Sequence, residues 1–409
     1  MRHHLKMSNM NSKILTIHGG HDCSVTFIDK KNCLRTFQLE RFSKIRHCSF
    51  SKLYNYTNCK SKVKTDFFEY IKTQWKEEPQ VVLHSQLDKD SYFYIDKIFN
   101  NSRLIQMGHH TSHGIGAYYQ SGFKDALVIT MDGGGVDFNH FSISNKPKGA
   151  CISYSFIKIV NNSIKVLATS NSPGAMEFTP GQYPTPVLII SEVKDPHKFG
   201  HFENLFTDDK SYISTDYLNP NAGKLMGLAA YGKVCEDVFW RDKLKKYYML
   251  HPLNAHNPLV SAMLLKELSE DGRSFLGMEG SEQQILPDCI SGQDSYDLAA
   301  TNQYVFEELC FELIKPYVDN CDLDIVLSGG CALNVLFNQK LALYLQDQNR
   351  KLFISPTPGD EGLSLGHYST FTKTLGDNYS IYSGFDILDR DKIPEYYNKY
   401  KKIGKVIEL

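Results

Sequence analysis

Three short apolar segments of this chain each end in consecutive glycines, and this repetition constrains the fold more than any other feature. The segments are KILTIHGG, ALVITMDGGG and LDIVLSGG. Their glycines are Gly19 and Gly20; Gly133, Gly134 and Gly135; and Gly329 and Gly330. Short apolar runs bounded by glycine predict buried strands. Glycine also closes ordinary hairpins, but three such strand ends, where backbone amides can approach phosphate oxygens, favour a nucleotide cleft between two lobes.

The rest of the sequence extends this α/β pattern. The segments at 13–42 predict a meander of three strands, with Glu40 and Arg41 at the end of the third, and those at 65–75 and 86–99 predict helices. A further helix is expected from His109 to Tyr119, and two strands at 153–160 and 163–170. After a helix at Ala299–Leu313, two strand-loop-helix units follow. We therefore predict a first lobe at 13–124 and a second at 125–372.

Two segments fit this pattern less well. Residues 173–222 are rich in Pro, Gly, Asp and Asn, which predicts a long loop, insertion or lid within the second lobe. Residues 373–409 form a polar, Tyr-rich tail with one short helix expected near 391–401.

Composition excludes several classes of protein. The 409 residues include 45 basic and 46 acidic side chains, a balance that disfavours a polymeric nucleic-acid substrate. No stretch approaches the ~20 apolar residues that a membrane span needs, and the N-terminus lacks the apolar core of a signal peptide. The ten cysteines are scattered and form no CxxC pair, so we expect reduced thiols and a cytoplasmic protein.

Two histidines and two aspartates form a candidate metal site. His109 and His113 are four residues apart, which places both imidazoles on one face of the predicted helix, while His110 points elsewhere. Asp132 ends a predicted strand and Asp360 lies in a Pro-Gly loop, positions from which a carboxylate can enter a cleft. An isolated HxxxH is usually accidental, but this nitrogen and oxygen donor set suits Fe(II), Mn(II) or Zn(II).

Several stretches in order resemble the O-carbamoyltransferases typified by nodulation protein U and the cephalosporin and aminoglycoside carbamoyltransferases. They are GGHDCSVTFID, LERFSKIRH, GHHTSHGIGAYYQSGF, ALVITMDGGG, GKLMGLAAYGK, LSGGCALNVLFN and SPTPGDEGLSLGHY. The resemblance implies a two-lobed actin-like fold of the sugar-kinase and heat-shock ATPase superfamily. It also implies that carbamoyl phosphate and ATP form carbamoyladenylate, whose carbamoyl group passes to an acceptor hydroxyl at the metal site. The implied metal ligands are His109, His113, Asp132 and Asp360.

Four further residues match family positions. His21 is expected close to the carbamoyl group, to polarise it or relay a proton, although a turn histidine can simply face solvent. Arg46 stands where the family commonly has lysine and is expected to face the donor. Lys224 is expected to contact nucleotide or to be a solvated charge, and Asn334 to bind ribose or base or to cap a helix. A salt bridge is the simplest explanation for the pair at 40 and 41.

The family's second domain, of the YrdC type, makes the adenylate, and this chain ends before such a domain. We therefore expect that a separate protein supplies the intermediate, that the chain is a truncation or an isolated catalytic domain, or that activity is lost. The acceptor, a small molecule or a nucleotide, and the oligomeric state are not predictable from the sequence. Three alternatives remain: a threonylcarbamoyl transferase acting on tRNA, a small-molecule kinase, and a non-catalytic nucleotide-binding regulatory partner.

Overall fold

The computed structural model describes residues 13–43, 45, 47–50, 60–87, 89–137, 151–169, 222–236, 241–242, 245, 293–375, 379, 394–395 and 398. Arg46, the predicted lid up to residue 221 and most of the predicted helix at 391–401 lie outside these residues. Within the described part of the chain, no helix is both long and apolar enough to cross a membrane.

The first lobe is built on a mixed five-stranded sheet with the order β3-β2-β1-β4-β5. Neighbours β1, β2 and β3 are antiparallel, whereas β4 is parallel to β1 and β5 to β4. The strands are β1 (Ile14–His18), β2 (Ser24–Ile28), β3 (Leu34–Gln38), β4 (Val81–Ser85) and β5 (Arg103–Gln106).

The second lobe repeats this architecture with the order β10-β9-β6-β7-β8. Again the first three strands of the lobe are antiparallel neighbours, whereas β9 is parallel to β6 and β10 is parallel to β9. The strands are β6 (Ala126–Val136), β7 (Cys151–Val160), β8 (Ser163–Thr169), β9 (Asp324–Ser328) and β10 (Leu352–Ile354). The two lobes have separate sheets with the same strand arrangement. This duplication confirms the predicted α/β fold with duplicated, actin-like lobes.

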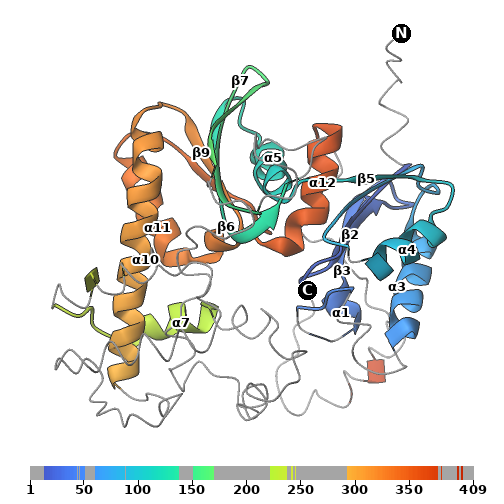
Figure 1. Ribbon diagram of the computed structural model, residues 1–409, viewed down its shortest axis with the longest axis horizontal. Helices are drawn as coiled ribbons and strands as arrows, with labels where there is room; N and C mark the ends of the chain where they lie inside the picture. Colours follow the sequence, from blue (N-terminus) through green and yellow to red (C-terminus); the bar gives the residue numbers. More distant parts are fainter. Residues whose placement is uncertain are drawn as a thin grey trace.

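Helices cover the outer face of each sheet (Figure 1). Their apolar side chains pack against the strands. In the first lobe, α1 (Leu39–Ser43), α3 (Lys60–Gln74) and α4 (Lys89–Ile98) contribute to one buried cluster with β1 and β2. In the second lobe, α10 (Gln293–Asp319) and α11 (Val335–Gln346) form a corresponding cluster with β6 and β9. The short helix α7 (Ala222–Leu228) and the 3-10 turn η9 (Ala229–Tyr231) pack on α10.

Two buried helices cross between the lobes. Helix α5 (His109–Ser121) follows the first sheet but packs on the second, while α12 (Leu363–Thr372) follows the second sheet but packs on the first. They lie side by side between the sheets (Figure 1). A Cβ atom on Gly116 would lie 2.5 Å from Cα of Gly366, so both positions lack room for a side chain. This close crossing brings the start of α5 and the start of α12 to one place.

Two expectations about local structure are wrong, and two strands were missed. The third strand ends at Gln38, and Glu40 and Arg41 belong to α1, because buried Leu39 already begins a helical turn. Gly133, Gly134 and Gly135 do not form a turn but lie inside β6, which bulges there before it pairs with β7 again. Strands β4 and β5 were not predicted, since short apolar runs such as VVLHS do not distinguish a strand from a helix.

Candidate metal centre

His109, His113, Asp132 and Asp360 converge on one buried point between the lobes. His109 is the first residue of α5 and His113 lies one turn later. Asp132 comes from β6, and Asp360 begins the 3-10 turn η11 (Asp360–Gly362) that leads into α12. One ligand atom from each of the four lies within 4.8 Å of the others, and all four side chains are buried. The structure thus brings together the set of four residues that the sequence predicts.

The distances between these atoms suit a shared metal ion. Nε2 of His109 lies 2.9 Å from Oδ2 of Asp132, 3.2 Å from Nε2 of His113 and 3.4 Å from Oδ1 of Asp360. Nε2 of His113 lies 3.3 Å from Oδ1 of Asp360. Donors bonded at about 2.1 Å to one ion are about 3.0 Å apart at right angles and about 3.4 Å apart in a tetrahedron. The residues therefore fit a first-row divalent metal with nitrogen and oxygen ligands.

Glycine and an acidic side chain set the position of His109. A Cβ atom on Gly135 would lie 2.1 Å from Cγ and Cδ2 of the His109 ring, so the ring occupies space that only glycine leaves open. At the N-terminus of α5, the Asp137 carboxylate accepts hydrogen bonds from the Thr111 amide at 3.4 Å and its hydroxyl at 3.0 Å. A carboxylate here satisfies a free helix amide and complements the helix dipole. Asp137 was not identified from the sequence.

The glycine turn after β9 holds Asp132. The Gly330 amide donates a hydrogen bond to Oδ1 of Asp132 at 2.8 Å. Gly329 has a φ of 92°, and a Cβ atom there would lie 2.2 Å from the carbonyl oxygen of Met131. The Gly330 amide, which was expected to face a phosphate, therefore orients a carboxylate of the metal site. Outer contacts of this kind fix the geometry of metal ligands.

Asp360 also contacts two histidines of the first lobe. Its Oδ2 lies 3.2 Å from Nε2 of His21 and 3.5 Å from Nε2 of His18. Burial opposes a charge on His21, but the negative charges of Asp360 and Asp22 outweigh it and raise its pKa to about 10. Burial lowers the pKa of His18. His21 is thus at the site where the sequence places it, whereas His18 was missed because an apolar strand gave no signal for it.

Both carboxylates of the site are held in the ionised form. Burial favours the neutral acid, but the hydrogen bond from His109 holds the pKa of Asp132 well below its usual range, and the charges of His21 and His109 do the same for Asp360. Burial lowers the pKa of His110 to about 3, and its ring is not part of the four-residue cluster. Two ionised carboxylates beside imidazole nitrogens are suited to a divalent cation.

Hydroxyl groups and imidazoles next to the metal cluster form a network that joins the two lobes. Oγ of Ser85 lies 3.0 Å from Nδ1 of His18 and 2.7 Å from Nε2 of His367 in α12. Nδ1 of His367 lies 2.6 Å from Oγ of Ser112 in α5. All of these side chains are buried. The network connects β1, β4, α12 and α5, so it ties both crossing helices to the first sheet.

The remaining predicted residues lie elsewhere or outside the described side chains. Asn334 caps α11: its Oδ1 accepts the Phe337 amide at 3.0 Å, and its amide group donates to Oε1 of Gln303 at 2.9 Å. Lys224 is in α7, but its side chain is outside the described part of the chain, as is Arg46. Gly133 and Gly134 follow Asp132 in β6. Nη1 of Arg41 lies 3.7 Å from Oε1 of Glu40, as expected for a salt bridge between them.

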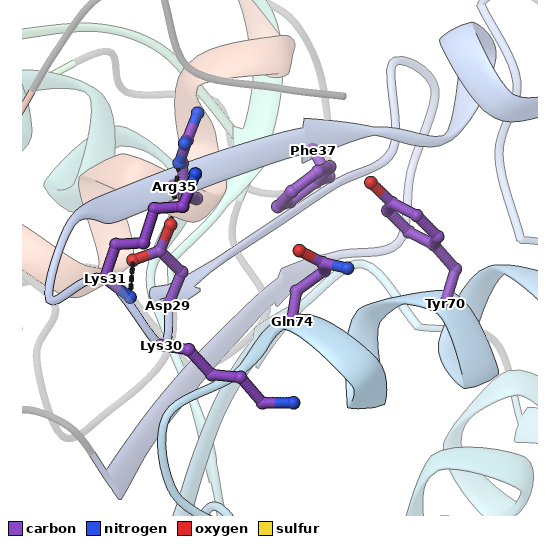
Figure 2. A pocket seen from close by; sticks show the side chains of 7 residues that line it. All are labelled: Asp29, Lys30, Lys31, Arg35, Phe37, Tyr70 and Gln74. Atoms are coloured by element: carbon purple, nitrogen blue, oxygen red, sulfur yellow. Dashed lines mark hydrogen bonds and ion pairs between the residues drawn. The ribbon is translucent and has the colours of Figure 1, made fainter. Parts of the chain in front are cut away.

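A separate hollow of about 160 Å³ lies between the β2–β3 hairpin and α3 (Figure 2). Asp29 at its wall accepts hydrogen bonds from the Lys31 amide and from Nε of Arg35. Figure 2 shows that the Lys31 side chain extends toward Arg35, whereas Lys30 extends in the opposite direction past Gln74. The positive charges do not converge, so this hollow lacks the features of an anion site.

The chain is similar to carbamoyltransferases in sequence. A family model for the carbamoyltransferase N-terminus matches residues 56–368. An uncharacterized protein of Methanocaldococcus jannaschii is 25% identical over 363 residues, which are 86% of this chain and 56% of that protein. Nodulation protein NolNO of Sinorhizobium fredii is 24% identical over 280 residues, 68% of this chain and 32% of NolNO. Nodulation protein U of Azorhizobium caulinodans is 26% identical over 196 residues, 46% of this chain and 32% of that protein.

These relatives are longer, since the chain spans 32% to 56% of their length. Among solved structures, full-length HypF in the phosphate- and nucleotide-bound form is 16% identical, with a TM-score of 0.42 over 90% of this chain and 57% of HypF. A putative N-acetylglucosamine kinase from Porphyromonas gingivalis gives a TM-score of 0.35 at 10% identity, over 88% of this chain and 100% of the kinase. The family model matches most of the chain, so the chain belongs to the carbamoyltransferase N-terminus family.

Proposed function

We propose that this protein transfers a carbamoyl group from carbamoyladenylate to a hydroxyl group of a small-molecule or nucleotide acceptor. In this reaction the acceptor oxygen bonds to the carbamoyl carbon, the bond from that carbon to the phosphate oxygen breaks, AMP leaves, and the hydroxyl proton is released. The observation that carries the proposal is the convergence of His109, His113, Asp132 and Asp360, in a member of the carbamoyltransferase family, at one buried point.

Each residue of the site has a distinct part in this proposal. The two histidines and two aspartates would hold the metal, which supplies Lewis-acid stabilisation of charge that develops on oxygen during acyl transfer. Nε2 of His21 lies 3.2 Å from Oδ2 of Asp360. From this position His21 would form a hydrogen bond to carbamoyladenylate beside the cluster. The four ligands are buried, which would limit the access of bulk water that competes with the acceptor hydroxyl.

The test supplies the donor in two ways. The purified protein is incubated with isotope-labelled carbamoyl phosphate, ATP and one of Fe(II), Mn(II) or Zn(II), with and without an adenylate-forming domain from a relative. A host metabolite extract provides acceptors, and mass spectrometry follows the gain of one carbamoyl group. We expect a metal-dependent labelled product, and the mass of that product identifies the acceptor.

A matched pair of histidine variants shows whether the cluster is responsible. His113→Asn removes a proposed ligand, while His110→Asn changes the same side chain in the same buried helix outside the cluster. Label transfer should be lost in the first variant and retained by the folded fraction of the second. Equal transfer by His113→Asn and the wild type would contradict the proposal, as would the absence of any labelled product with the donor present.

A further inference from the structure

A line of hydrogen bonds runs from His21 away from the metal cluster. Oδ2 of Asp22 lies 2.9 Å from Nδ1 of His21, and the other carboxylate oxygen lies 2.7 Å from Nδ1 of His47. The His47 backbone amide in turn donates to Oε2 of Glu40 at 2.8 Å. Because Nε2 of His21 faces Asp360, the line connects the metal site to α1 through one carboxylate and two imidazoles.

We propose that Asp22 and His47 are positioning residues that hold the His21 ring with its Nε2 directed at the metal site. This inference rests on the proposed function, in which His21 acts on the carbamoyl donor. An imidazole that donates from Nδ1 to a carboxylate must present Nε2 on the opposite side of the ring. Asp22 thereby determines both the rotation of the His21 ring and which nitrogen faces the cluster.

His47 prevents the Asp22 carboxylate from rotating. Each oxygen of Asp22 is engaged by a different imidazole, so a rotation of the carboxylate breaks at least one hydrogen bond. A carboxylate held by a single partner would leave the ring of His21 free to follow it. The second imidazole therefore makes the orientation of the first one definite, in the way that outer contacts orient metal ligands.

The backbone holds the two residues in place at a conformational cost. Asp22 has a φ of 58° and His47 a φ of 51°, a left-handed region that residues other than glycine seldom adopt. The segments that carry them are joined by the hydrogen bond from the amide of Cys23 to the carbonyl of Cys48 at 2.9 Å, and both cysteines are buried. Residues held in sparsely populated backbone regions cluster at active sites and ligand clamps.

Asp22, Glu40 and His47 also lie close enough together to hold a metal ion. The positioning role needs no ion there, because the hydrogen bonds of Asp22 and His47 already account for their arrangement. The metal content of the variants separates the two explanations. If wild-type protein binds a second metal equivalent that Asp22→Asn loses, the positioning proposal is wrong.

The variants are chosen to suit the left-handed backbone. Asparagine and glycine both tolerate it. Asp22→Asn keeps the size of the side chain but can accept from only one imidazole, His47→Asn keeps an N–H donor near the place of Nδ1, and His47→Gly removes the donor. Asp29→Asn is the matched control. Asp29 also accepts several hydrogen bonds in the first lobe, but it lies at the end of β2 that is remote from the metal site.

Label transfer from carbamoyl phosphate and ATP in the presence of the adenylate-forming domain, the binding of AMP, metal content and urea unfolding are measured for each variant. We expect turnover to fall about 10- to 100-fold in Asp22→Asn and His47→Gly, while AMP affinity and metal content stay within about twofold of wild type. His47→Asn and Asp29→Asn should keep most of the turnover. Unchanged turnover in Asp22→Asn, or an equal loss in His47→Asn and His47→Gly, overturns the proposal.

A crystal structure separates this inference from the proposed function. If wild-type protein transfers no label, the function fails, and the orientation of His21 is then compared in crystals of wild type and Asp22→Gly. A single His21 ring orientation in wild type that spreads over several in the variant supports the positioning role. An unchanged ring in Asp22→Gly overturns it whatever the activity.

Discussion

Replacing Gly135 by alanine should displace a metal ligand without altering any ligand atom. The added Cβ would lie 2.1 Å from Cγ and Cδ2 of His109, whereas ordinary contacts begin at 3.4 Å, so the ring or the strand must move by about 1.3 Å. Metal-ligand distances vary by only about 0.2 Å in well-formed sites. We therefore expect metal affinity to fall by at least about tenfold.

The assay compares Gly135→Ala with Gly227→Ala, where the added methyl group meets no atom within 4 Å. Each metal-free protein is titrated with Zn(II) or Mn(II) by calorimetry, and bound metal is counted after dialysis. Overpacking at Gly135 should also lower the free energy of unfolding by about 1–3 kcal/mol, so folding is checked by urea unfolding. A folded Gly135→Ala protein that binds metal as tightly as wild type would refute His109 as a ligand.

Three further predictions concern single side chains. Asp360→Asn should lower metal affinity at least about tenfold in calorimetry, and an unchanged affinity would exclude Asp360 from the site. Burial and the nearby carboxylates raise the pKa of Glu361 from 4.5 to about 7. The free energy of unfolding of the metal-free protein therefore falls as the pH rises through this range. Urea unfolding should show Glu361→Gln gaining on wild type from pH 5 to 8; a constant difference would contradict this. Ser85→Ala leaves buried nitrogens of His18 and His367 without their hydroxyl partner and should cost about 1–3 kcal/mol of unfolding free energy, a loss that equal urea midpoints would disprove.

The strand pattern of the sequence was sufficient to predict two similar α/β lobes, because apolar runs and the turns between them are local features. The actin-like fold class came from the family resemblance. The helix from His109 and the strand-loop-helix units near the C-terminal side are confirmed for the same reason. The exchange of α5 and α12 between the sheets is not local. It depends on the contact between Gly116 and Gly366, which are far apart in the sequence.

The same difference between local and long-range features applies to the candidate site. A spacing of four residues predicted that His109 and His113 share a helix face. The position of Asp132 at a strand end and of Asp360 in a Pro-Gly loop made them candidates, and the resemblance implies the same four ligands. Interactions that join distant segments were missed, among them the hydrogen bond from Gly330 to Asp132 and the contacts of Asp22. A glycine before a helix is typical both of a phosphate site and of an amide that binds a side chain, so sequence pattern does not separate the two.

The metal assignment behind the proposed function is tested most directly by anomalous diffraction. Crystals grown with Fe(II), Mn(II) or Zn(II) are measured on both sides of the absorption edge of the metal. We predict one anomalous peak bonded, at about 2.0–2.2 Å, to Nε2 of His109 and His113 and to carboxylate oxygens of Asp132 and Asp360. A metal-loaded protein without a peak at these four residues, or with its peak elsewhere, would contradict the account.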